Sequence, residues 1–181
     1  MYNKLIAILL LFLLLPILCI VSIFILLADG FPIMFVQKRY GRKNKYFDIY
    51  KFRTMKKNTP NIATDKMKEN PYYKGGLILR KLSLDEIPQL FNIIKGDMNF
   101  IGPRPALYNQ IDLAKARHEI GIDNLKPGIT GWAQINGRDL ISEKEKVDLD
   151  YFYLKNKSFK LNCKILVKTI YKVLSVKDIS E

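Results

Sequence analysis

The residues best placed for chemistry lie between Arg80 and Gln89, where the sequence is RKLSLDEIPQ. Asp85 and Glu86 are adjacent carboxylates, and they follow the cations Arg80 and Lys81. We expect the cations and a helix start to keep Asp85 ionised. An ionised aspartate among cations can act as a nucleophile toward phosphorus or as a ligand of Mg²⁺.

The same segment also has a purely structural interpretation. Ser83 and Glu86 match the capping box S-x-x-E, in which each side chain accepts from a free backbone N–H at the start of a helix. A capping box would account for Glu86 without catalysis, and it leaves Asp85 as a carboxylate of the first turn. Pro88 is expected to distort this turn and expose the pair. Both interpretations stay open at this point.

Two further segments end or centre on an arginine. Residues 102–105, GPRP, hold Arg104 between two prolines that restrict the backbone, which suits an arginine that must meet a phosphate. Residues 126–138, KPGITGWAQINGR, contain glycines that allow close backbone approach, and they end in Arg138. The structural alternatives are a rigid connection for the first segment and a core or membrane-interface position of Trp132 for the second.

Short helices and one hairpin must position these residues. Aromatic and β-branched residues flank the turn-rich tetrad at 41–44, which predicts a β-hairpin from Ile33–Lys38 and Tyr46–Met55. Residues 56–76 are polar and contain two prolines, which indicates a loop with one short helix. Apolar residues at helical spacing predict helices over residues 84–95, 106–119, 143–153 and 159–174. The predicted fold class is α+β and mainly helical.

An uncharged apolar segment, Leu5–Ala28, precedes these elements. As one straight helix it would be about 36 Å long, enough to cross a hydrocarbon core of about 30 Å. Pro16 at its midpoint should bend the helix and leave two arms that are each too short to cross. Lys4 before the segment and the cations of 38–45 after it both carry the signature of a cytoplasmic face. A kinked span and a re-entrant helix-break-helix over residues 1–30 both remain possible.

Composition narrows the protein class. The chain has 181 residues, a net charge of +13 and 49% hydrophobic residues, which excludes a wholly disordered protein. Its 2 cysteines provide neither a disulfide framework nor the spacing of a zinc site. Residues 31–181 have the length of one domain. The excess of basic over acidic residues is greatest next to the apolar segment. Positive charge there can bind the anionic headgroups of lipids, or nucleic acid.

The C-terminal predicted helix has a basic stripe, because lysines recur at every fourth position. These lysines are Lys160, Lys164, Lys168 and Lys172. The helix can lie in the membrane interface with the lysines toward phosphate headgroups. It can equally present an ordinary solvated face over a protein core.

Taken together, the motifs resemble those of the bacterial sugar transferases, and more closely the small monotopic phosphoglycosyl transferases. The match begins at the proline-broken apolar segment and continues through YKFRTM at 50–55, LSLDE at 82–86, GPRP at 102–105, PGITGWAQ at 127–134 and NGR at 136–138. It covers nearly the whole chain. The sequence departs from the family at Leu15, since a serine is common there before Pro16.

The resemblance implies a reaction. A phosphosugar would pass from a UDP-sugar to a polyprenol phosphate, usually undecaprenyl phosphate, with release of UMP. Asp85 would be the nucleophile that forms an aspartyl phosphosugar and would partly hold Mg²⁺, while Glu86 would deprotonate or position the lipid phosphate. Candidates for contacts with phosphate and nucleotide are Arg53, Arg80, Arg104 and Arg138.

The resemblance also implies a location. Residues 1–30 would form a re-entrant membrane helix, and residues 31–181 a catalytic domain with interfacial amphipathic helices on the cytoplasmic face of the bacterial inner membrane. Nucleic acid is not an expected partner, and neither the sugar nor the oligomeric state can be read from the sequence. The competing hypothesis is a membrane-anchored basic protein that binds anionic lipid or nucleic acid without catalysis.

Overall fold

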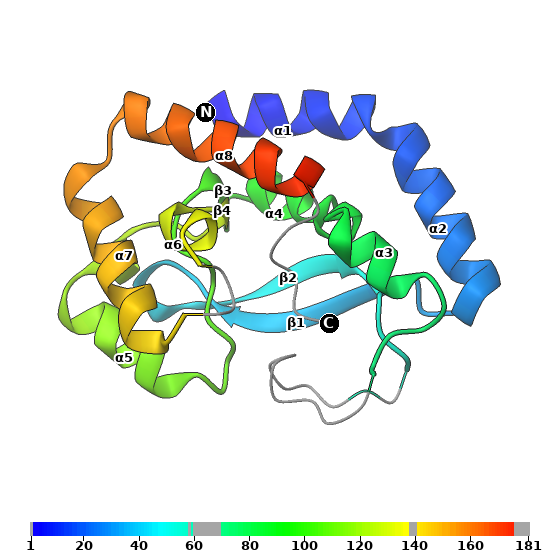
Figure 1. The fold of residues 1–181 in the computed structure, drawn as a ribbon, viewed down its shortest axis with the longest axis horizontal. Coiled ribbons are helices and arrows are strands. Elements are labelled where there is room, and N and C mark those ends of the chain that lie inside the picture. The colour runs from blue at the N-terminus through cyan, green and yellow to red at the C-terminus, as the bar shows by residue number, and fades with distance from the viewer. Residues whose placement is uncertain (1, 58, 60–69, 138–140, 176–181) are drawn as a thin grey trace.

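The structure is a computed structural model that describes residues 2–57, 59, 70–137 and 141–175. It is mainly helical, with two small two-stranded sheets (Figure 1). The elements in chain order are α1 Tyr2–Leu13, α2 Leu15–Asp29, β1 Met34–Tyr40, η1 Arg42–Asn44, β2 Tyr46–Phe52, α3 Gly76–Lys81, η3 Leu84–Glu86, α4 Gln89–Lys95, β3 Asn99–Ile101, α5 Ile111–Glu119, η4 Ile122–Asn124, β4 Gly128–Thr130, α6 Trp132–Ile135, α7 Glu143–Asn156 and α8 Phe159–Ser175.

The apolar N-terminal segment forms two helices that meet at Leu14 with a bend of 61°. Pro16 lies in the first turn of α2, where its missing N–H and its ring prevent the helix from continuing straight from α1. The predicted break is therefore confirmed. Among the described residues, no single helix is long and apolar enough to cross a membrane, whereas α1 and α2 taken together meet that test of length and composition.

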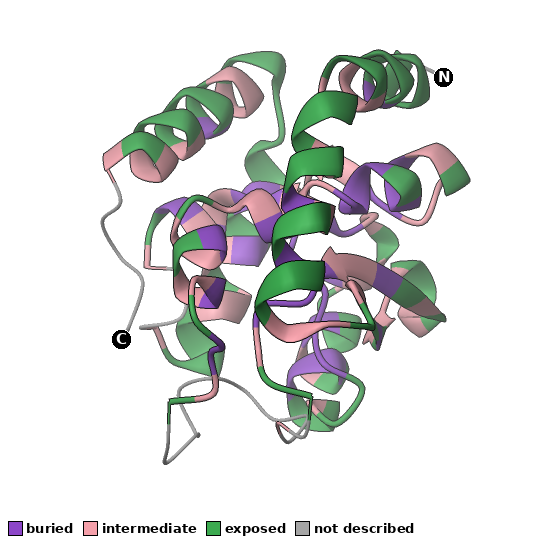
Figure 2. Cartoon of the chain, turned by 90° about the vertical axis from the view of Figure 1, so that its right-hand side faces the viewer, coloured by how far each residue is buried: buried purple, intermediate pink, exposed green. Residues whose placement is uncertain are grey.

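The inner faces of this helix pair pack on the rest of the protein. Ala7 of α1 is fully buried in a cluster with Leu90 and Ile93 of α4, and the small side chain lets the two helices approach closely. Val21 and Ile25 of α2 join a second cluster, which also contains residues of β2 and α3. The outer face of α2 is exposed, as Figure 2 shows. The predicted division at residue 30 into a membrane helix and a catalytic domain stays a prediction.

The β-hairpin predicted from the sequence is confirmed. Strands β1 and β2 are antiparallel, in a register that pairs Met34 with Phe52 and Tyr40 with Tyr46. Asn92 of α4 holds the hairpin in place, because its side-chain oxygen accepts from the Tyr50 N–H at 3.1 Å and its amide donates to the Asp48 carbonyl at 2.7 Å. Asn92 is fully buried, so these two hydrogen bonds fix β2 against α4.

A parallel pair of short strands, β3 and β4, brings the two glycine-containing motifs together. Asn99 pairs with Gly128 and Ile101 with Thr130. A Cβ atom on Gly128 would lie 2.1 Å from the Gly102 nitrogen, so only glycine permits this approach. The Pro-Arg-Pro segment leaves the sheet directly after β3, beside β4.

Several helix predictions need correction. The helix expected over 84–95 is divided into η3 and α4, and Ser83 has a left-handed φ of 55° with no capping hydrogen bond. The predicted capping box at Ser83 is therefore wrong. The helix expected from residue 106 begins at Ile111, and α3 was not predicted. Most of the loop predicted over 56–76 lies outside the described residues.

The two C-terminal helices agree with the sequence. Helix α7 begins with a true capping box, in which Ser142 and Glu145 accept from each other's backbone N–H groups. Helix α8 is held over the small parallel sheet by buried Ile165 and by a 2.7 Å hydrogen bond between the Thr130 and Thr169 hydroxyls. Helices α1 and α8 both run along the upper side of the molecule in Figure 1.

Candidate active site

The paired carboxylates lie on the 3₁₀ turn η3, between α3 and α4. Because Ser83 turns the chain with a left-handed conformation, the helix that precedes the pair ends at Lys81 and a new turn presents Asp85 and Glu86. Asp85 is only 5% exposed. A carboxylate that is buried in this way and surrounded by charged groups is typical of a reactive site.

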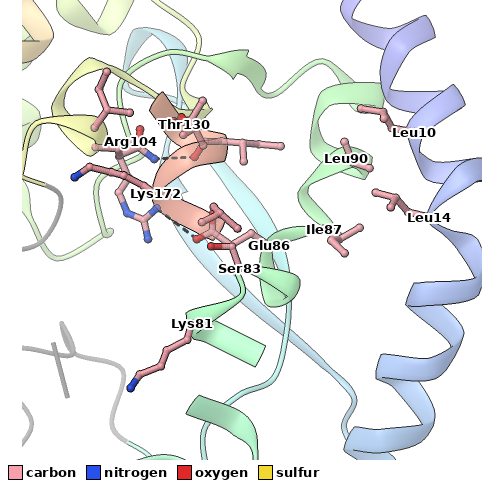
Figure 3. A pocket seen from close by; sticks show the side chains of 15 residues that line it. Leu10, Leu14, Lys81, Ser83, Glu86, Ile87, Leu90, Arg104, Thr130 and Lys172 are labelled. Carbon is pink, nitrogen blue, oxygen red and sulfur yellow. Dashed lines mark hydrogen bonds and ion pairs between the residues drawn. The ribbon is translucent and has the colours of Figure 1, made fainter. Parts of the chain in front are cut away.

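Glu86 joins three segments that are far apart in the sequence. Its carboxylate accepts from Lys51 Nζ of β2 at 2.7 Å and lies 3.4 Å from Arg104 Nη1 of the Pro-Arg-Pro segment. Figure 3 shows the second contact beside the cavity. The structure thus brings together the YKFRTM, LSLDE and GPRP motifs that were picked out from the sequence.

Burial and charge act in opposite directions on Asp85. Loss of solvation raises the pKa of its carboxyl from 3.8 to about 6, against the effect of the Lys51 ammonium. The negative charge of Glu86 adds to the rise, while Arg80 and Arg104 oppose it. The cations oppose the rise in pKa, as expected from the sequence, but burial has the larger effect. Asp85 is still mostly ionised at neutral pH.

Lys51 is a site residue that the sequence analysis did not select. Burial lowers the pKa of its ammonium, and the negative charge of Glu86 opposes that change. The sequence does contain a signal for Lys51, because side chains alternate between the two faces of a strand. Lys51 therefore lies on the same face as Ile49, which is buried. A lysine on the inner face of a strand requires an anionic partner.

The predicted arginines occupy different surroundings. Arg80 stands over the Tyr72 ring at 5.8 Å from its centroid, close enough to Asp85 to lower the pKa of that carboxyl. Arg104 lines the cavity beside Glu86. Arg138 lies outside the described residues.

Arg53 has a bridging position, and its predicted contact with phosphate stays a prediction. Its guanidinium donates to the Asp29 carboxylate and to backbone carbonyls of residues 29, 30, 32 and 55. These acceptors engage all five N–H donors of an arginine. Arg53 therefore ties the end of α2 to β2, and its contribution to the site is to hold the hairpin against the bent helix pair.

The backbone of Arg104 is held by residues that the sequence analysis also missed. Arg117 of α5 donates from Nη1 to the Arg104 carbonyl at 2.8 Å and from Nη2 to Asp150 of α7 at 2.5 Å. Asp150 is 1% exposed, and burial raises the pKa of its carboxyl against the effect of Arg117. No local sequence signal pairs residues so distant in the chain.

A cavity of about 280 Å³ opens beside Glu86, between α1 and α8. Figure 3 shows charged side chains at one end, and Leu10 and Leu14 at the other. Within the described part of the chain, no group of three or more acidic, histidine or cysteine residues could hold a metal ion. A Mg²⁺ ion that takes one or two carboxylates and completes its shell with substrate phosphates is compatible with the Asp85–Glu86 pair.

The raised pKa of Asp85 gives a first prediction. Asp85→Asn removes a group that is protonated in the folded state up to about pH 6 and in the unfolded state only up to 3.8. Without divalent cations, wild-type stability should therefore fall by up to about 3 kcal/mol between pH 4 and pH 7 relative to the variant. Thermal unfolding in detergent at each pH measures this difference, and parallel curves for the two proteins would contradict it.

Comparison with known proteins supports the interpretation of these motifs. Residues 1–176 match the family described as Bacterial sugar transferase. The chain is 43% identical to the "Uncharacterized sugar transferase EpsL" of Bacillus subtilis, over 91% of this chain and 84% of the relative. It is 36% identical to the "Exopolysaccharide production protein ExoY" of Sinorhizobium fredii, over 93% of this chain and 82% of the relative.

Longer relatives match over a smaller part of their length. The "UDP-glucose:undecaprenyl-phosphate glucose-1-phosphate transferase" of Escherichia coli is 37% identical over 92% of this chain, which spans 38% of that relative. The chain also spans 40% of an Aeromonas hydrophila enzyme named as an undecaprenyl-phosphate N-acetylgalactosaminephosphotransferase. The family match over nearly the whole chain and these relatives agree: the chain belongs to the bacterial sugar transferases, a family of transferase enzymes.

Proposed function

We propose that this protein transfers a phosphosugar from a UDP-sugar to undecaprenyl phosphate and releases UMP. The observation that carries the proposal is the buried, mostly ionised Asp85, which Lys51, Glu86 and Arg104 surround. Relatives named as undecaprenyl-phosphate phosphotransferases for glucose, galactose and N-acetylgalactosamine support the reaction class. A basic protein that only binds lipid or nucleic acid would not need a buried carboxylate pair.

The reaction divides into two displacements at one phosphorus. In the first, an Asp85 carboxylate oxygen attacks the β-phosphorus of the UDP-sugar, the bond from that phosphorus to the bridging oxygen breaks, and UMP leaves. In the second, an oxygen of the lipid phosphate attacks the same phosphorus. The bond to Asp85 breaks, the carboxylate is restored, and a lipid diphosphosugar leaves.

Burial suits Asp85 for this role. A poorly solvated carboxylate is more basic, and hence more nucleophilic, than an exposed one, and a pKa of about 6 leaves it mostly ionised at neutral pH. Lys51 and Arg104 supply positive charge within reach of Glu86, so the pair of carboxylates is not left uncompensated. The same cations favour the anionic phosphates that must approach.

Glu86 is proposed to position the lipid phosphate and to accept its proton. Its carboxylate already lies on the cavity wall, held by a lysine and an arginine. Arg104 and Arg80 are proposed to contact the donor phosphates. Mg²⁺ is proposed to be held partly by Asp85 and by the diphosphate of the donor, whose charge it would neutralise when bound.

The bent helix pair is proposed to enter the inner leaflet and return to the cytoplasmic face of the bacterial inner membrane. The 61° bend and the exposed apolar side chains of α1 and α2 support this topology. A site at the headgroup plane can reach a soluble nucleotide and a lipid phosphate without moving either through an unfavourable solvent.

The decisive experiment measures UMP release from a panel of UDP-sugars, by nanodisc-held protein with Mg²⁺ and undecaprenyl phosphate. One donor should give turnover, and Asp85→Asn should reduce it by at least about 10³-fold because the amide cannot replace the carboxylate as nucleophile. A matched control, Asp112→Asn, changes an exposed aspartate of α5 and should stay within about twofold. Near-normal turnover by Asp85→Asn would remove Asp85 as nucleophile.

The proposed metal has its own test. Addition of EDTA should stop UMP release, and Mg²⁺ should restore it, since attack by one anion on another needs a counterion. The exchange of labelled UMP into the UDP-sugar, measured without lipid, isolates the first displacement. Exchange that continues unchanged in EDTA would exclude a required metal.

The topology is tested by labelling. Single cysteines placed at Tyr2 and at Phe31, in a variant without Cys19 and Cys163, should react with an impermeant maleimide only from the cytoplasmic side of oriented vesicles. Both ends should behave alike because a re-entrant pair returns to its side of entry. Labelling of Tyr2→Cys from the opposite side would establish a span.

A further inference from the structure

The cavity between α1 and α8 changes character along its length. Lys81, Ser83, Glu86, Arg104 and Lys172 form one end, here called the charged end. Leu10, Leu14, Ile87 and Leu90 form the other, here called the apolar end. Figure 3 shows the two groups on opposite sides of the view, with Ile87 and Leu90 lying toward α1.

We propose that this cavity holds the lipid acceptor, with its phosphate at the charged end and its first isoprene units at the apolar end, and that Lys172 of α8 positions the phosphate. The inference rests on the proposed function and goes beyond it by naming the subsite and a residue. Lys172 belongs to none of the catalytic motifs. It lies on a helix that otherwise resembles a membrane-surface helix.

The net positive charge of the charged end favours binding of a phosphate monoester. The lining there has three cations, Lys81, Arg104 and Lys172, against the single carboxylate of Glu86. Glu86 is also the neighbour of the proposed nucleophile. A phosphate bound among these cations would therefore lie next to the phosphosugar on Asp85, as the second displacement requires.

Two contacts fix the position of Lys172. Buried Ile165 anchors α8 on the body of the protein, and the Thr130–Thr169 hydrogen bond holds the following turn over β4. Lys172 comes three residues after Thr169, so it lies on the same helix face. Lys160, Lys164 and Lys168 are exposed, whereas Lys172 is half-buried and lines the cavity.

The apolar end excludes the nucleotide sugar as occupant. A uridine or a sugar placed against four aliphatic side chains would bury hydroxyl and carbonyl groups without partners, at a cost of about 1–3 kcal/mol for each. A prenyl chain has no such groups. Leu14 lies at the bend of the helix pair and Leu10 one turn before it, next to Leu9 and Leu13, which are 58% and 61% exposed. The chain can thus pass from the cavity onto the apolar surface of α1.

The test separates the two substrates. Lys172→Gln should raise KM for undecaprenyl phosphate at least about tenfold, the effect of losing a charge-assisted hydrogen bond. The rate at which UMP exchanges into the UDP-sugar without lipid should not change. Lys172→Arg should recover most of the affinity. The control Lys168→Gln, one turn earlier on the exposed face, should change KM by less than about twofold.

A second pair of variants tests the apolar end of the cavity. Leu14→Ser should raise KM for undecaprenyl phosphate severalfold, whereas Ile20→Ser, at an exposed position of α2 outside the lining, should not. If the wild-type protein shows no exchange of UMP into any UDP-sugar, both the proposed function and this assignment are overturned. Normal exchange with equal KM values for Lys172→Gln and Lys168→Gln would overturn the assignment alone. Loss of exchange in Lys172→Gln would place Lys172 at the donor instead.

Discussion

The ion pairs of Glu86 with Lys51 and Arg104 are the interaction on which the site depends. They join a hairpin strand, a 3₁₀ turn and the Pro-Arg-Pro segment, which lie far apart in the sequence. The Glu86 and Lys51 side chains are 11% and 13% exposed, so removal of one partner leaves a buried charge at a cost of about 3–5 kcal/mol. These ion pairs also fix the position of Asp85, because Asp85 is the preceding residue of the same turn.

The network continues outward to elements that do not touch the carboxylates. Arg117 holds the backbone of Arg104, and Asp150 of α7 holds Arg117, so α5 and α7 support the guanidinium that faces Glu86. On the other side, Arg53 ties α2 to the strand that carries Lys51. The N-terminal helix pair and the C-terminal helices therefore both support one largely buried pair of charges.

The sequence predicts the elements whose signals are local. Alternation and a turn-rich tetrad identified the hairpin, Pro16 identified the bend, and helical spacing identified α7 and α8. The capping box shows the limit of such signals. The pattern S-x-x-E occurs at Ser83 and at Ser142, but only Ser142 has the extended backbone that lets its oxygen reach the third residue. At Ser83 the left-handed backbone points the oxygen elsewhere.

Site residues were missed for a related reason. Asp85, Glu86 and Arg104 stand in motifs, so residue type and spacing reveal them. Lys51 pairs with Glu86 at a separation of 35 positions and Arg117 with Asp150 at 33, and pairing over such distances depends on tertiary packing. Arg53 shows that an arginine in a motif can also support the fold, by donating to backbone carbonyls.

The packing of α1 on α4 links the position of the bent helix pair to the position of Asp85. Ala7 is fully buried against α4, so α1 cannot shift without disturbing the cluster that also holds Ile93 and Met98. Helix α4 follows the turn that carries Asp85 after only Ile87 and Pro88. The depth at which the apolar helix pair sits in a bilayer would therefore set the height of Asp85 above the hydrocarbon. One contact between two helices would thus place the proposed nucleophile where the proposed soluble donor and lipid acceptor can both arrive.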